Sequence, residues 1–114
     1  MQDLEKFHCH IYFDDTNRDY AKFLYEKAKL DLCDLFIGKF HEKLVGPHLK
    51  HNFMMGFSAK HFLRVNRWLM NNRKNLEVLV HADTGYDFID HTERCFWYGQ
   101  NIGINKSKLD PDPQ

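Results

Sequence analysis

The clearest indication of the fold is the stretch FHCHIYF at residues 7–13, because apolar side chains alternate there with histidines and a tyrosine. Successive side chains of a β-strand point to opposite faces of a sheet. One face of this stretch is therefore apolar, and the other carries His8, His10 and Tyr12. A strand with one buried face and one polar aromatic face fits this alternation.

The segments that follow this strand complete a known order of elements. Apolar residues recur every four positions over 17–35, which is typical of a helix, and the periodicity of apolar residues indicates the other helix and the other strands in the same way. We expect helices at 17–35 and 59–72, strands at 39–45, 52–58, 76–82 and 96–99, and a loop at 83–92. Up to residue 82 the order is βαββαβ, which predicts an α+β, ferredoxin-like antiparallel sheet with two helices on one face.

One domain accounts for the whole chain. We expect the ferredoxin-like domain to span residues 1–106 and residues 107–114 to form a flexible C-terminal tail. Two helices on one face leave the other face of the sheet uncovered, and in a single sheet of this size a partner, a ligand or a tail must cover it. A homodimer that pairs the two open faces is the expected solution.

Composition narrows the class of function. The 114 residues include 16 Lys+Arg and 16 Asp+Glu, a balance that argues against a nucleic-acid partner held by phosphate contacts. No apolar run approaches the ~20 residues that span a bilayer, so no membrane association is expected. The three cysteines have no CxxC spacing, which predicts a reducing, cytoplasmic setting.

Histidine is the unusual residue, with eight in so short a chain. Strand alternation places His8, His10 and His81 together on the open face, while a Gly-Pro turn aims His48 towards it and His91 follows in the next loop. A single strand histidine is more often a hydrogen-bonded structural group than a metal ligand. Five on one predicted face favour a site, and transition metals such as Fe(II) and Zn bind neutral imidazole. Solvent exposure is expected instead for His41, His51 and His61.

An ordered set of short motifs runs from about residue 7 to residue 99. The set comprises HCHIYF (8–13), GPH (46–48), NR (72–73), LEVLVH (76–81), TG (84–85), DHT (90–92) and WYG (97–99). Together these motifs resemble the DOPA 4,5-dioxygenase family of small fungal and bacterial proteins. Two positions depart from the family pattern, since Leu49 follows the GPH motif and Tyr86 precedes Asp87, and both could alter substrate choice.

The resemblance implies a ferredoxin-like dimer that binds a non-haem metal and opens catechol rings with O2. Its substrates would be DOPA and related catechols such as caffeic acid, and its cofactor Fe(II), with Zn or Ni possible in purified protein. The family's histidine motifs carry over to His10, His48 and His81 as metal ligands. His8 and His91 would act as a further ligand or as acid/base groups.

Side-chain chemistry suggests the substrate contacts. Tyr12, Phe57 and Trp97 could wall the aromatic ring, and Arg73 could meet a substrate carboxylate. Non-haem iron is commonly held by two histidines and a carboxylate, for which Glu77 and Asp90 are candidates, but we expect an all-histidine site. A non-catalytic zinc- or nickel-binding module is the alternative function. RNA binding is a third possibility, because this fold also hosts RNA-recognition domains.

Overall fold

The computed structural model describes residues 3–112 of the chain. Its strands are β1 (Lys6–Phe13), β2 (Phe36–Ile37), β3 (His51–Ser58), β4 (Val78–Ala82) and β5 (Cys95–Tyr98). Its α-helices are α1 (Arg18–Asp31), α2 (Phe62–Asn72) and α3 (Asp87–Thr92). Short 3-10 turns lie at Ala59–His61 and Lys106–Lys108.

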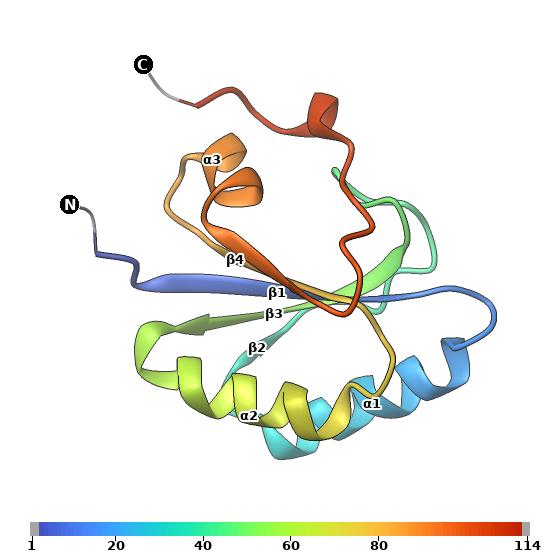
Figure 1. The fold of residues 1–114 in the computed structure, drawn as a ribbon. Coiled ribbons are helices and arrows are strands. Elements are labelled where there is room, and N and C mark those ends of the chain that lie inside the picture. The colour runs from blue at the N-terminus through green and yellow to red at the C-terminus, as the bar shows by residue number, and fades with distance from the viewer. Residues whose placement is uncertain (1–2, 113–114) are drawn as a thin grey trace.

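The strands form one antiparallel sheet in the order β2-β3-β1-β4-β5. The first four strands of that order have the ferredoxin-like arrangement, and β5 extends it at the edge beside β4. Helices α1 and α2 lie together on one face, as Figure 1 shows. The predicted α+β fold is therefore confirmed; β5 corresponds to the strand expected at 96–99, and α3 is an additional helix.

The core lies between the sheet and these two helices. Side chains from β1 meet helix residues that recur on one side of each helix, because an amphipathic helix buries a single stripe. Fully buried contributors from both layers are Cys9, Ile11, Phe13, Leu24, Phe53, Val65 and Leu69. This packing fixes the direction of β1 and so holds His8, His10 and Tyr12 on the opposite face.

Three expected elements differ from the structure. Helix α1 ends at Asp31 and not at residue 35, because the chain turns at Leu32 to bring Phe36 against β3. The strand expected at 39–45 is wrong. Beyond β2, the main contacts with β3 are a Gly38 hydrogen bond and one isolated bridge at His41. The loop expected at 83–92 contains α3.

The face opposite α1 and α2 is partly covered by the chain itself. Helix α3 and the segment after β5 run across it, at the top of Figure 1. That segment is tied down where Ile104 bridges His48 and where the Asn105 N–H donates to the Pro47 carbonyl at 2.7 Å. Homodimer formation stays a prediction.

The predicted tail begins inside this covering segment. Leu109 is 9% exposed, and the Asp112 carboxylate accepts hydrogen bonds from the Phe88 and Ile89 N–H groups at the start of α3. Residues 113–114 lie outside the described residues. None of the helices within residues 3–112 is long and apolar enough to cross a membrane.

Candidate metal centre

Three histidines meet where β1 pairs with β4. The antiparallel register sets His8 directly opposite His81, and His10 follows two residues later on the same face of β1. One ring nitrogen from each of the three lies within 4.8 Å of the others. The sheet register therefore assembles the group, as the strand alternation predicts.

His10 and His81 face each other through their Nε2 atoms, which are 3.0 Å apart. The His81 Nδ1–H donates to the Ala82 carbonyl at 2.8 Å, and the His10 Nδ1–H donates to the Asn52 Oδ1 at 3.2 Å. A neutral imidazole carries one proton, so both Nε2 atoms present lone pairs to the same point. Two facing acceptors repel unless a cation lies between them.

Asn52 is a candidate site residue that was not predicted from the sequence. It is 1% exposed, and its amide Nδ2 has no hydrogen-bond partner within residues 3–112. Such an unpaired buried donor costs about 1–3 kcal/mol. The sequence does carry a signal for Asn52. It is a polar residue in an otherwise apolar strand, and strand alternation places it on the same face of the sheet as the histidines.

His48 lies on the other side of His10. Their ring centroids are 4.0 Å apart, and the His48 Nδ1 shares a 2.7 Å hydrogen bond with the Tyr12 hydroxyl. His48 does not belong to the group of nitrogens within 4.8 Å that His8, His10 and His81 form. The structure thus brings His48, itself a predicted ligand, beside His10 and anchors it through Tyr12, while His8 takes its place in the group of three nitrogens.

Helix α3 brings His91 to the same place. Its ring centroid is 4.0 Å from that of His81, and its Nδ1 hydrogen-bonds the Asp87 carbonyl at 2.8 Å. Asp90 holds the helix in position, because its carboxylate accepts from the Thr84 N–H and hydroxyl at 2.7 and 2.8 Å. Because a carbonyl only accepts, the His91 proton lies on Nδ1 and leaves Nε2 open.

Burial keeps these histidines neutral. Burial, and then the neighbouring His91, lower the pKa of His81 to about 3 and that of His48 to about 4. The pKa of His10 is lowered well below its ordinary value by burial and then by His48. The pKa of His8 is lowered by burial, against the opposing effect of Asp83. Near neutral pH few protons compete with a metal for these nitrogens.

The predicted substrate contacts divide between the two faces. Phe57 is not on the histidine side: it lies in the core, where its ring contacts those of Phe7 and Phe62. Trp97 stacks on Tyr12 with ring centroids 5.7 Å apart, on the histidine side of the sheet. Arg73 is not brought to the histidines: its Nη1 donates to the Leu76 carbonyl at 2.8 Å, and its guanidinium covers the Tyr98 ring. Tyr98 alternates with Trp97 and faces the helices.

Neither candidate carboxylate joins the histidine group. Glu77 forms an ion pair with Lys50 at 3.2 Å, and Asp90 is engaged by Thr84 and lies 3.7 Å from Arg94. The donor set within 4.8 Å is all-histidine, as the sequence predicts. Imidazole is a ligand for Zn, Cu, Fe and Ni, so these residues fit a transition metal.

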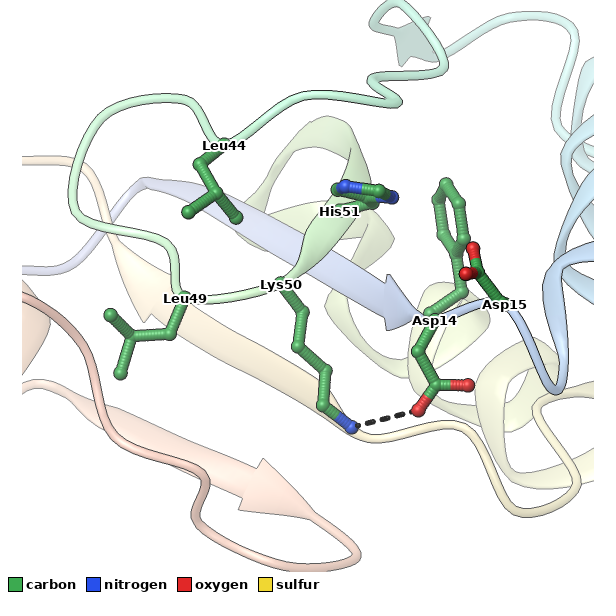
Figure 2. A pocket seen from close by; sticks show the side chains of 7 residues that line it. Asp14, Asp15, Leu44, Leu49, Lys50 and His51 are labelled. Atoms are coloured by element: carbon green, nitrogen blue, oxygen red, sulfur yellow. Dashed lines mark ion pairs between the residues drawn. The ribbon is translucent and has the colours of Figure 1, made fainter.

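A hollow lies at the end of β1, away from the histidine group. Figure 2 shows its lining, with the Asp14 carboxylate facing the Lys50 ammonium and Asp15 next to Asp14 along the chain. The Lys50 ammonium is 3.5 Å from the Asp14 carboxylate and also pairs with Glu77, so its charge is already balanced. This hollow contributes no residue to the metal centre.

The facing Nε2 pair also has the spacing of two ligands on one ion. Nitrogens bound to one ion at about 2.0–2.1 Å lie about 2.9 Å apart at the right angle of an octahedral site and about 3.3 Å apart at the tetrahedral angle of a zinc site. The sequence model described as the Dopa 4,5-dioxygenase family matches residues 7–108, which include all five clustered histidines. The chain belongs to the DOPA 4,5-dioxygenase family.

Individual relatives agree with this membership. The chain is 26% identical over 117 residues to the DOPA 4,5-dioxygenase of Amanita muscaria, covering 94% of this chain and 50% of that protein. It is 32% identical over 112 residues to an uncharacterized 21.2 kDa protein of Botryotinia fuckeliana, covering 89% of this chain and 61% of that protein. The chain thus spans about half to three fifths of these curated relatives.

A solved structure extends the likeness to the fold. The crystal structure of a "putative dioxygenase" from Nostoc punctiforme superposes with a TM-score of 0.83 at 33% identity. The match covers 94% of this chain and 95% of that chain. In length this DOPA 4,5-dioxygenase family member therefore matches the cyanobacterial protein more closely than the fungal ones.

Proposed function

We propose that this protein is a metal-dependent dioxygenase that opens the ring of a catechol such as DOPA or caffeic acid by extradiol cleavage. The facing Nε2 atoms of His10 and His81, 3.0 Å apart, are the observation that supports a metal site most strongly. Family membership and the cyanobacterial neighbour support the dioxygenase class.

His10 and His81 are the proposed metal ligands, with His8 as the third. All three offer a nitrogen within the same 4.8 Å group, and their lowered pKa values keep them unprotonated. A bound Fe(II) would supply the Lewis acidity that holds a catecholate and the redox chemistry that uses O2. His48 stays the alternative third ligand predicted from the sequence.

His91 is the proposed base. Its Nδ1–H is committed to the Asp87 carbonyl, so the Nε2 lone pair can accept the second hydroxyl proton of the catechol and return it later. This role is supported by the position of the His91 ring on helix α3, where its centroid is 4.0 Å from that of His81.

Trp97 is the proposed ring contact, and Tyr12 supports it from below. The Trp97 ring is partly exposed and stacks on Tyr12, which is 1% exposed and lies next to His10 and His48, so a planar catechol can lie against Trp97. Burial raises the pKa of Tyr12, so its phenol stays protonated and keeps the His48 ring in place. These residues orient the substrate and exclude water from one of its faces.

The test is O2 uptake by the full chain loaded anaerobically with Fe(II), over a panel of catechols. We expect O2 consumption and a yellow ring-opened product with caffeate or L-DOPA, both lost in His10→Ala and His81→Ala. His61→Ala is the matched control, since His61 lies near Asp34 and outside the metal centre. Metal binding without O2 uptake from any catechol would support the zinc- or nickel-binding module instead.

Metal analysis of two further variants identifies the third ligand. His8→Ala should lower the bound metal content if the grouped nitrogens are the ligands, whereas His48→Ala should leave it unchanged. The opposite result would make His48 the ligand and leave His8, 3.3 Å from the Asp83 carboxylate, as an acid/base group.

A further inference from the structure

A cavity of about 240 Å³ borders the metal centre on the side of β5. Its floor includes His91, Cys95 and Trp97, and its far wall is the chain after β5, with Asn101, Ile104 and Lys106. His91 connects the cavity to the metal centre, because it lines the cavity and its ring centroid is 4.0 Å from that of His81. The cavity therefore lies beside the proposed metal centre and is bordered by Trp97.

The far wall is fixed by contacts with other parts of the chain. Ile104 bridges to His48, and the Asn105 N–H donates to the Pro47 carbonyl at 2.7 Å. Asn105 then begins the 3-10 turn, its side chain accepting from the Ser107 N–H at 3.2 Å. Lys106 opens that turn, so its position relative to His48 is set by the backbone.

Lys106 gives this cavity its charge. Among the described residues that line it, none is acidic, and within residues 3–112 no carboxylate forms an ion pair with Lys106. Asn101 adds an amide whose oxygen accepts from the Gly103 N–H at 2.9 Å, which leaves its N–H groups as donors. One ammonium and one amide at the wall opposite the histidines form an environment that favours an anion.

The cation predicted from the sequence for this role is elsewhere. Arg73 packs on Tyr98 on the helix side of the sheet, and Lys50 is held by Asp14 and Glu77. A cation that contacts a substrate carboxylate in this cavity must therefore come from the residues that line it, and Lys106 is the lysine among them.

We propose that Lys106, assisted by Asn101, makes this protein selective for catechols that carry a carboxylate on the side chain opposite the diol. This inference rests on the proposed function, because it places the diol at the histidines and the ring beside Trp97. Neutral catechols and aromatic amines would lack the contact with Lys106. L-DOPA and caffeate share the carboxylate, whereas dopamine and 4-methylcatechol lack it.

Binding to the zinc-loaded full chain tests the proposal without turnover, because zinc has no redox chemistry. The probes are caffeate and 4-methylcatechol, titrated by calorimetry and by quenching of Trp97 fluorescence. In Lys106→Gln we expect about two- to fivefold weaker caffeate binding, the range of a charged contact at an exposed lysine, and unchanged binding of 4-methylcatechol. Lys106→Arg should retain the preference for caffeate.

Lys108→Gln is the matched control, because Lys108 belongs to the same short turn but does not line the cavity. Higher salt should weaken caffeate binding to the wild type and to this control, but not to Lys106→Gln. With the iron-loaded protein, Lys106→Gln should raise the KM for caffeate and leave kcat unchanged.

Three results would overturn the proposal: equal weakening of both probes in Lys106→Gln, no weakening of either, or no binding of caffeate to the wild type. Failure of the proposed function has a different signature. The iron-loaded protein would then consume no O2 with any catechol, while the zinc-loaded protein still distinguished caffeate through Lys106.

Discussion

The substitution Asn52→Leu separates the effect of Asn52 on metal affinity from its effect on the stability of the metal-free protein. Asn52 lies on β3, opposite Tyr12 in the register, and its Oδ1 accepts from the His10 Nδ1–H at 3.2 Å. Leucine has a similar volume but neither accepts nor donates a hydrogen bond. The substitution therefore frees the His10 ring to rotate and to change the nitrogen that carries its proton.

The two effects on free energy can be worked out separately. Loss of the hydrogen bond costs about 1 kcal/mol of unfolding free energy, and removal of the unpaired Nδ2 returns about 1–3 kcal/mol. The metal-free protein should thus be as stable as the wild type or slightly more stable. Metal affinity should fall about 10–100-fold, the usual effect of removing the group that orients a ligand histidine.

Two assays measure these quantities. Urea unfolding in the presence of a chelator gives the stability of the metal-free protein, and zinc titration against a chelating dye at pH 7 gives the affinity. Met54→Leu is the matched control, because Met54 pairs with His10 in the register and forms no hydrogen bond with it among the described contacts. Unchanged zinc affinity in Asn52→Leu would show that Asn52 does not orient His10 for metal binding. A loss of metal-free stability above about 2 kcal/mol would show that the unpaired Nδ2 does not destabilise the fold.

Three further predictions test separate parts of the structure. In the metal-free protein the melting temperature should drop between pH 7 and pH 5, because the lowered pKa values of His48 and His81 make the unfolded chain bind more protons below its ordinary pKa of about 6.5. A melting temperature independent of pH would contradict the buried, neutral histidines. Asp90→Ala should cut turnover at saturating catechol and leave zinc affinity nearly unchanged, because Asp90 positions His91 through Thr84 and does not touch the ligands. Equal loss of metal would show that α3 supports the ligands as well. Cys33 should react quickly with a thiol reagent at pH 8 while Cys9 reacts after unfolding, since Cys33 is exposed and burial raises the pKa of Cys9 to about 12. Rapid labelling of Cys9 in the folded protein would contradict its place in the core.

Strand alternation was sufficient to predict the meeting of His8, His10 and His81. A period of two is a local property of the chain, and the antiparallel pairing of β1 with β4 follows from the βαββαβ order. The same rule places Trp97 and Tyr98 on opposite faces of β5. It could not place Arg73, because the direction of a side chain after a helix end depends on its packing partner, here the Tyr98 ring.

Long-range contacts explain what the sequence did not show. Helix α3 is six residues long, and its first N–H groups are capped by Asp112, more than twenty residues later in the chain. No pattern within 83–92 reports that contact. Likewise Lys106 reaches the cavity because Ile104 and Asn105 attach to the loop that carries His48.

Anomalous diffraction from a crystal of the zinc-loaded full chain is the most direct test that His10 and His81 bind one metal ion. We expect one zinc peak between β1 and β4, about 2.0–2.1 Å from the Nε2 atoms of both His10 and His81. A zinc peak bound elsewhere, such as beside Asp14 and Asp15, with the His10 and His81 Nε2 atoms still facing each other across an empty space, would contradict it.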